Sequence, residues 1–151
     1  MTNPKGTVNV PCVYVVLSKK DKILFMLREH TGFMDGSYCL PSGHVEDGEN
    51  FIDAAIRETQ EEVGVTVRRD KMRLIYTMHR QAANDIRVDV FFEADEWEGE
   101  PHNKEPHKHG DIEWFSVEEI AKKSIMDYQA IALQAIIEGK IYSEWGWPEA
   151  K

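Results

Sequence analysis

Acidic side chains gather in residues 43–65, whose sequence is GHVEDGENFIDAAIRETQEEVGV. Glu61 and Glu62 follow Glu58 by three and four residues, a spacing that places them on one face of an α-helix. Like charges at these spacings destabilise a helix by roughly 0.2–0.5 kcal/mol per pair, and Arg57 is the one nearby cation in the helix. A run of glutamates is often only a solvated face. Alternatively, the three carboxylates could bind Mg²⁺, which takes carboxylates, waters and substrate phosphates as ligands. The positive charge of the ion would then offset the repulsion between the glutamates.

The helix that carries these carboxylates is predicted to run from about Glu49 to Val63 and to end at Gly64, a favoured C-cap residue. Its predicted core stripe, at spacings of four, three and four residues, comprises Ile52, Ile56, Thr59 and Val63. The glutamates are expected more than about 100° away from that stripe, near Ala54, whose small side chain leaves room above them. In the preceding loop, Gly43 and Gly48 are expected to allow tight turns.

The complete spacing, G-x5-E-x7-R-E-x-x-E-E-x-G, resembles the Nudix box. The matching residues are Gly43, Glu49, Arg57, Glu58, Glu61, Glu62 and Gly64, and Val65 fills the closing apolar position. Thr59 stands where the pattern has an aliphatic residue, but it still suits the core stripe. Ser42 stands where many relatives have a second glycine, whose backbone carbonyl often binds the metal, and a serine can supply that carbonyl too.

The resemblance implies an α/β (α+β) fold, a Nudix-type α/β/α sandwich with a mixed β-sheet. It also implies metal-dependent hydrolysis of a nucleoside diphosphate linked to another moiety, X, with Mg²⁺ or Mn²⁺ as the cofactor. Glu58, Glu61 and Glu62 would hold the metal with Ser42, and Glu58 or Glu61 would also orient or deprotonate the attacking water. The residues with structural roles in the box would be Gly43, Glu49, Arg57 and Gly64, with Arg57 paired to Glu49.

The resemblance continues beyond the box. Residues 96–120 look like the downstream half of MutT-type nucleoside triphosphate hydrolases, in which a polar loop brings one more glutamate to the metal site. Glu105 is the candidate by position, and its weaker alternatives are Glu98, Glu100 and Glu113. Arg28 ends a predicted strand where MutT-type proteins place a phosphate-binding arginine. Leu40 and His79 are further candidates for contacts with the substrate.

The expected reaction is therefore cleavage of a (deoxy)nucleoside triphosphate to the monophosphate and pyrophosphate. ADP-ribose, another nucleotide sugar or a dinucleoside polyphosphate is the alternative substrate, and a non-catalytic nucleotide-binding domain is the alternative role. The sequence does not select the base, because base pockets are built from scattered side chains, and Tyr14, Leu40, His79 and the last helix all stay open as lining.

The rest of the sequence predicts the strands and helices that must position the candidate site residues. Strands are predicted at residues 8–17, 23–27, 38–40, 65–67, 72–80, 86–94 and 112–115. Residues 96–111 form a polar loop, a Ser116–Glu119 capping box begins a short helix, and residues 126–138 form the last helix. This mixture indicates a layered α/β domain.

Composition limits the number of domains, the class of partner and the expected location of the protein. A chain of 151 residues fits one domain, residues 1–151. The formal net charge of −9 disfavours long nucleic acids as partners and leaves a small nucleotide as the expected substrate. No apolar run approaches the roughly 20 residues of a membrane helix, and the N-terminus lacks an apolar signal core, so we expect a cytoplasmic protein without a membrane contact. Cys12 and Cys39 lack CxxC spacing, which favours reduced thiols.

Two further groups of residues have alternative interpretations. His102, His107 and His109 are not expected to form a zinc site, because no cysteine or fixed histidine pair supports one. The tail YSEWGWP, residues 142–148, is expected to form a packing patch or a dimer contact. A monomer and a homodimer are both compatible with the sequence.

Overall fold

Groups of strands are separated by helices in the computed structural model, which describes residues 6–149. The strands are β1 (Asn9–Lys19), β2 (Lys22–Arg28), β3 (Tyr38–Cys39), β4 (Ser42–His44), β5 (Arg73–Gln81), β6 (Ile86–Ala94), β7 (His109–Ser116) and β8 (Tyr142–Trp145). The helices are α1 (Phe51–Val63), the 3₁₀ turn η1 (Arg69–Lys71), α2 (Val117–Ile120) and α3 (Asp127–Ile137). No helix within residues 6–149 has the length and apolar character needed to cross a membrane.

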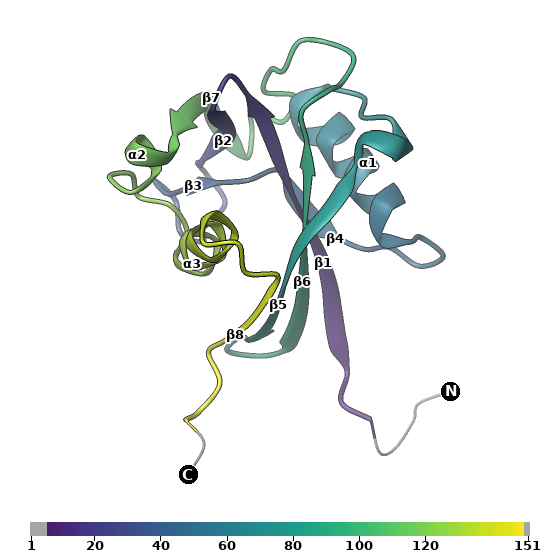
Figure 1. Cartoon of the computed structure of the whole chain (residues 1–151), viewed down its shortest axis with the longest axis vertical. Helices are drawn as coiled ribbons and strands as arrows, with labels where there is room; N and C mark the ends of the chain where they lie inside the picture. The colour runs from purple at the N-terminus through teal and green to yellow at the C-terminus, as the bar shows by residue number, and fades with distance from the viewer. Residues whose placement is uncertain (1–5, 150–151) are drawn as a thin grey trace.

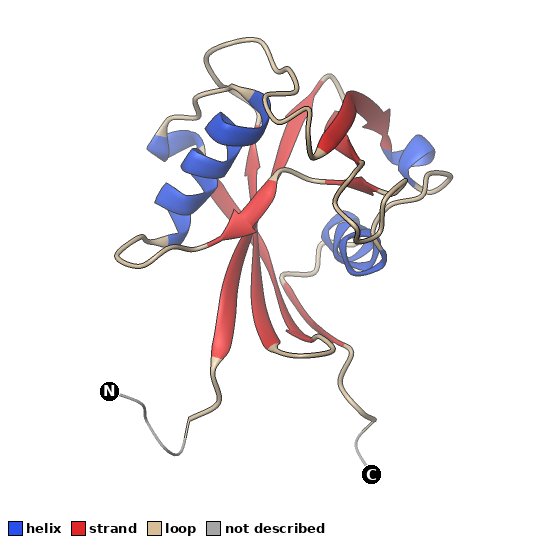
Figure 2. Ribbon diagram, turned by 180° about the vertical axis from the view of Figure 1, so that it is seen from behind, coloured by secondary structure: helices blue, strands red, loops and turns tan. Residues whose placement is uncertain are grey.

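The strands form one mixed sheet in the order β3-β2-β1-β6-β5-β8, with β4 paired to β1 and β7 paired to β2. The β1–β6 and β5–β8 pairs are parallel, and the other pairs are antiparallel. Helices α1 and α3 lie on opposite sides of the central strands (Figure 1). The same layers appear from behind in Figure 2, and the expected mixed sheet between helices is confirmed.

Strand β1 forms the centre of the core. Its residues 12–17 read CVYVVL and are all buried, as expected for a strand covered by protein on both faces. The β1–β2 hairpin turns at Lys20 and Asp21, which have φ values of 51° and 61°. Two adjacent positive φ values suit the right-handed twist of a tight hairpin. This hairpin carries β2 outward so that Arg28 ends beside α1 and the loop before β7.

Several predicted boundaries changed in the structure. Residues 65–67 make only an isolated bridge, between Thr66 and Glu98, rather than a strand. Residues 42–44 form β4, where a loop was expected from residue 43, because their backbone pairs with β1. The tail contributes β8, which pairs with β5 along residues 142–145. The Ser116–Glu119 capping box is confirmed, with hydrogen bonds in both directions.

Candidate active site

The carboxylates of α1 line a cavity of about 570 Å³, together with the end of β2 and the loop before β7. The predicted metal-binding residues that meet there are Ser42, Glu58, Glu61, Glu62 and Glu105. Arg28 and Arg57 line the same cavity. Side chains that are far apart in the sequence therefore share one concave site.

Helix α1 starts slightly later than predicted. It begins at Phe51, and the Asn50 side chain caps it by accepting a hydrogen bond from the Asp53 N–H at 3.0 Å. Its C-cap is Gly64, as predicted, with a φ of 72° and an N–H that donates to the Gln60 carbonyl. Glu49 therefore lies before the helix, where its carboxylate is free to contact Arg57.

The predicted pairing of Arg57 with Glu49 is present. Arg57 donates through Nε and Nη2 to the two Glu49 carboxylate oxygens, at 2.8 and 3.0 Å. It also donates to the His44 carbonyl at 3.0 Å and to Glu58 Oε1 at 2.7 Å. The hydrogen bond from Arg57 holds the pKa of Glu49 below its usual value. Arg57 thus ties the loop to the helix and fixes one side of Glu58.

Gly43 fixes the other side of Glu58. A β-carbon at position 43 would overlap the Glu58 carboxylate. The described residues with positive φ do not include Gly43, so the expectation of a special turn at this residue was wrong. The glycine is needed because the carboxylate packs directly against its backbone. Gly48, with a φ of 80° and open space around it, does act as the predicted turn glycine.

Glu62 is the most deeply placed carboxylate of the helix, with 5% of its surface exposed. One of its oxygens accepts a hydrogen bond from the Ser42 N–H at 3.0 Å. Burial raises the pKa of Glu62 well above its usual value, and the charges of Glu58 and Glu105 add to the shift. Burial likewise raises the pKa of Glu58. Without a bound cation, ionisation of both Glu58 and Glu62 is therefore unfavourable.

The predicted separation of Glu62 from the core stripe was wrong. At about 100° per residue, Glu62 lies only about 60° from Thr59, and Thr59 is fully buried. The buried side of α1 comprises Ala54, Ala55, Thr59, Glu62 and Val63. The small Ala54 and Ala55 let the helix approach the sheet closely, and this approach brings Glu62 under the backbone of β4.

The loop before β7 is anchored on the last turn of α1. His102 N–H donates to the Val63 carbonyl and Lys104 N–H donates to the Glu62 carbonyl, both at 3.0 Å. Such carbonyls have no partner inside a helix and need one from elsewhere. The docking brings Glu105 into the cavity beside Glu62. Its weaker alternatives do not line this cavity: Glu98, Glu100 and Glu113 lie elsewhere.

His109 lies in the site, although the sequence analysis considered it only among three histidines that were not expected to form a zinc site. It is 6% exposed, and its Nε2 lies 3.8 Å from Glu62 Oε2. Burial lowers its pKa, which favours the neutral imidazole. The signal in the sequence is the spacing of four residues from Glu105, because the two residues close one helical turn through the His109 N–H and the Glu105 carbonyl.

Of the three residues predicted to contact the substrate, Arg28, Leu40 and His79, only Arg28 lines the cavity. Arg28 lines the cavity, and its guanidinium donates to the Phe33 carbonyl at 2.9 Å. Leu40 is fully buried, so its side chain cannot contact a ligand. His79 lies outside the cavity, where its ring bonds Asn9 at 3.0 Å and packs on Trp147. Neither Leu40 nor His79 lines the carboxylate cavity, so the structure does not bring these two candidates together with Arg28.

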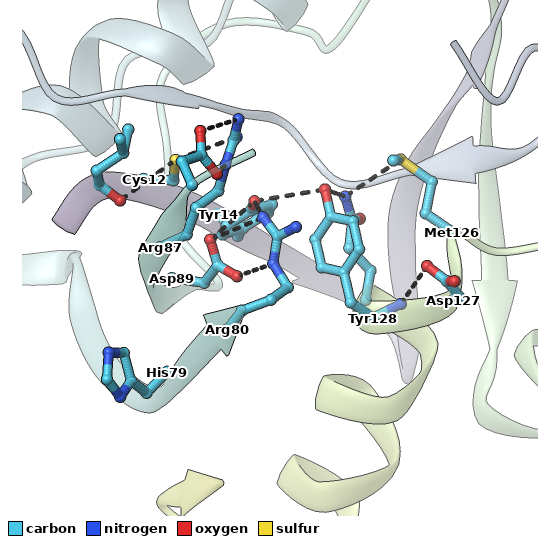
Figure 3. A network of polar contacts seen from close by, with 12 residues as sticks. Cys12, Tyr14, His79, Arg80, Arg87, Asp89, Met126, Asp127 and Tyr128 are labelled. Carbon is cyan, nitrogen blue, oxygen red and sulfur yellow. Dashed lines mark hydrogen bonds and ion pairs between the residues drawn. The ribbon is translucent and has the colours of Figure 1, made fainter. Parts of the chain in front are cut away.

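A second cavity of about 370 Å³ adjoins the first and shares Arg28, Ser42 and Gly43 with it. Its other lining residues are Cys12, Tyr14, Phe33, His44, Arg87, Met126 and Tyr128. A buried polar network borders this cavity through Tyr14 and Tyr128. Figure 3 shows the network and also shows His79, which lies away from it. Through Arg80 on β5 and Asp89 on β6, the network fixes two aromatic residues that line the cavity, Tyr14 on β1 and Tyr128 on α3.

In that network, Arg80 Nε donates to Asp89 Oδ2 at 2.5 Å, and Asp89 is fully buried. The Tyr14 hydroxyl donates to Asp89 Oδ1 at 3.2 Å. The Arg80 guanidinium lies over the Tyr128 ring, 3.8 Å from its centroid, as in a cation–π contact. The stacked guanidinium therefore holds the ring of Tyr128 in place.

The donor set of the first cavity fits a hard divalent cation. Five glutamates line it, and among residues 6–149 His109 is the only basic group within 4.0 Å of the Glu62 carboxylate. These glutamates are Glu46, Glu58, Glu61, Glu62 and Glu105. Buried carboxylates need paired charges or a metal. The oxygens of Glu62 and Glu105 and a nitrogen of His109 lie within 4.8 Å of one another. A cation at this place would relieve the repulsion that raises the pKa values of Glu58 and Glu62.

Comparisons with known proteins agree on the family. The NUDIX domain model matches residues 8–134. Nudix hydrolase 6 of Arabidopsis thaliana is 35% identical over 79 residues, covering 51% of this chain and 28% of that protein. The NAD-capped RNA hydrolase NudC of Photobacterium profundum is 38% identical over 58 residues, covering 38% of this chain and 21% of that protein. The chain thus spans well under two thirds of the length of these curated relatives.

Solved structures show the same fold. The MutT NUDIX hydrolase from Burkholderia pseudomallei superposes with a TM-score of 0.74 at 23% identity, covering 84% of this chain and 97% of that chain. At this level of identity, the likeness concerns the arrangement of strands and helices.

Proposed function

This chain belongs to the Nudix family, and we propose that it is a metal-dependent hydrolase that cleaves a pyrophosphate bond in a nucleoside diphosphate linked to X. The observation that carries the proposal is the convergence of Glu58, Glu61, Glu62 and Glu105 on one cavity. The preferred substrate is a (deoxy)nucleoside triphosphate, with the monophosphate and pyrophosphate as products.

In this proposal the carboxylates and the Ser42 carbonyl hold Mg²⁺ or Mn²⁺. The ion supplies charge neutralisation for the phosphates and activation of water. Glu61, whose side chain is 51% exposed, faces the open side and is suited to orient or deprotonate the attacking water. Glu58 is the alternative for this role, although Arg57 restrains it more tightly.

Arg28 is proposed to contact the phosphates, since it lies where the two cavities meet. The adjoining cavity, with Phe33 and Tyr128 in its lining, gives the nucleoside an aromatic surface against which to pack. Both cavities together suit a ligand with an anionic end and a planar end. A small nucleotide is therefore the proposed partner, and we further propose a single cytoplasmic domain that acts as a monomer or homodimer.

A dinucleotide diphosphate is the second candidate substrate. The likeness to NudC over 58 residues and the continuation of the cavity beyond the carboxylates favour it. The net charge of −9 favours a free dinucleotide over one attached to a long RNA.

A substrate panel separates these candidates. Nucleoside triphosphates, ADP-ribose and NAD are incubated with the protein and Mg²⁺ or Mn²⁺, and phosphate is measured with and without added inorganic pyrophosphatase. Signal that depends on pyrophosphatase supports the triphosphate. Cleavage of NAD or ADP-ribose into two monophosphates, with no pyrophosphate, supports the alternative. Absence of turnover for every substrate with both metals contradicts the proposal.

A further inference from the structure

His109 presents an unpartnered imidazole to the carboxylate cavity. Its side chain is more than nine-tenths buried, and Nδ1 has no hydrogen-bond partner within the described residues 6–149. Nε2 lies 3.8 Å from Glu62 Oε2, which is too long for a hydrogen bond. A buried imidazole without a hydrogen-bond partner is costly, so its place beside two carboxylates calls for an explanation.

The backbone around His109 is braced in a way that fixes this position. Asn103 accepts a hydrogen bond from the Glu105 N–H at 2.9 Å and donates to the His109 carbonyl at 2.7 Å. It also donates to the Gly110 carbonyl at 2.9 Å. The Asn103 side chain therefore links the two ends of the turn between Glu105 and His109. Both side chains are held on the side of the turn that faces Glu62.

We propose that His109 is a nitrogen ligand of the metal site, and that Glu62, Glu105 and His109 together select a transition-metal ion such as Mn²⁺ over Mg²⁺. One ligand atom from each residue lies within 4.8 Å of the other two, a spread that one ion can bridge. Mg²⁺ is bound mainly through oxygen, whereas an imidazole ligand favours first-row transition metals. The inference rests on the proposed function, because it assigns the metal preference of the same site.

The nitrogen ligation has a spectroscopic signature that is independent of turnover. In the wild-type protein loaded with Mn²⁺, electron spin-echo envelope modulation should show a directly bound ¹⁴N nucleus. In His109→Gln this modulation should disappear. In His107→Gln it should persist, because His107 is exposed on the same loop and does not line the cavity. The His107 variant is thus a matched control.

Calorimetric titrations then measure selectivity. The wild type should bind Mn²⁺ at least about 10-fold more tightly than Mg²⁺, and His109→Gln should lose about 10-fold in Mn²⁺ affinity while its Mg²⁺ affinity changes much less. A second variant, His109→Asn, should show the same loss of Mn²⁺ affinity, which would exclude an effect peculiar to the glutamine side chain. Its melting temperature shows whether it is folded.

Two results would overturn the inference. One is a Mn²⁺-loaded wild type without ¹⁴N modulation, and the other is an equal loss of Mn²⁺ and Mg²⁺ affinity in the His109 variants. If either result accompanies normal metal-dependent hydrolysis, the proposed function stands and only the role of His109 fails. A wild type that binds neither metal would contradict both.

Discussion

Gly43 and Gly48 serve different physical purposes, and substitution of each by alanine should separate these purposes at the scale of single residues. In Gly43→Ala the β-carbon displaces the Glu58 carboxylate. Because a misplacement of about 1 Å can cost about 10²-fold in rate, turnover should fall at least 10-fold. The free energy of unfolding, measured in urea, should change little, since position 43 needs no positive φ.

Gly48→Ala is the matched control. Its β-carbon meets open space, but its φ of 80° disfavours a side chain. The free energy of unfolding should fall by about 1–2 kcal/mol, with turnover close to that of the wild type. A Gly43→Ala variant with full activity would show that the close contact with Glu58 is unimportant for catalysis.

The Glu62 carboxylate should lower the stability of the fold without metal and raise it when metal is bound. In Glu62→Gln a buried carboxylate that opposes folding is removed, so the melting temperature in EDTA should rise. In the wild type, Mg²⁺ or Mn²⁺ at about 100 times its Kd should stabilise the fold by about 2.7 kcal/mol. This shift should be largely lost in the variant. Differential scanning fluorimetry with and without EDTA measures both, and an unchanged metal-induced shift in Glu62→Gln would argue against this ligand.

The two thiols should be inert at neutral pH. Burial raises the pKa of Cys12 to about 11 and that of Cys39 to about 12. Both stay protonated at pH 8, so iodoacetamide should label the native protein far more slowly than the unfolded protein, as followed by mass spectrometry. Because the folded pKa values exceed the usual 9.0, the free energy of unfolding should fall as pH rises above about 9. Rapid labelling of the native thiols would contradict their burial.

At the scale of elements, the helix and its following loop act as one unit. Asn103→Ala removes the brace of the Glu105–His109 turn. Metal affinity and turnover should fall by about 10-fold, the low end of the range for residues that orient ligands, while the melting temperature changes little. Asn84→Ala, on the exposed β5–β6 turn, is the control. If Asn103→Ala and Asn84→Ala had the same metal affinity and turnover, the Asn103 hydrogen bonds would not be needed to position Glu105 and His109.

The sequence predicted helix α1 well and the loop before β7 less well, for physical reasons. The spacing of Glu58, Glu61 and Glu62 is sufficient to bring them to one cavity, whereas the burial of Glu62 depends on how closely the helix packs on the sheet. The position of His109 depends on a turn and on its docking to the end of α1. The direction in which Leu40 and His79 face depends on long-range pairing and packing, which short-range spacing does not contain. Strand β8 was missed because its formation depends on the neighbouring β5.

At the scale of the whole molecule, the buried Arg80–Asp89 pair joins β5 to β6 under the second cavity. Asp89→Asn should lower the free energy of unfolding by about 3–5 kcal/mol, because it leaves a buried guanidinium without its partner charge. Urea denaturation of the variant measures the loss. The matched change Asp85→Asn, in a half-buried turn pair with Arg87, should cost less, about 1 kcal/mol, because water still reaches both side chains. Similar losses in both variants would contradict a structural role for the buried pair.

The most direct test of the central claim is hydrolysis by the wild type and by Glu61→Gln, prepared identically and followed by ³¹P NMR with nucleoside triphosphates and Mg²⁺ or Mn²⁺. The wild type should release the monophosphate and pyrophosphate, with all turnover abolished by EDTA. Glu61→Gln should be folded and at least about 10²-fold slower, as expected for the loss of a general base. Full turnover by Glu61→Gln, or hydrolysis that persists in EDTA, would contradict a metal-dependent reaction at the carboxylate face of α1.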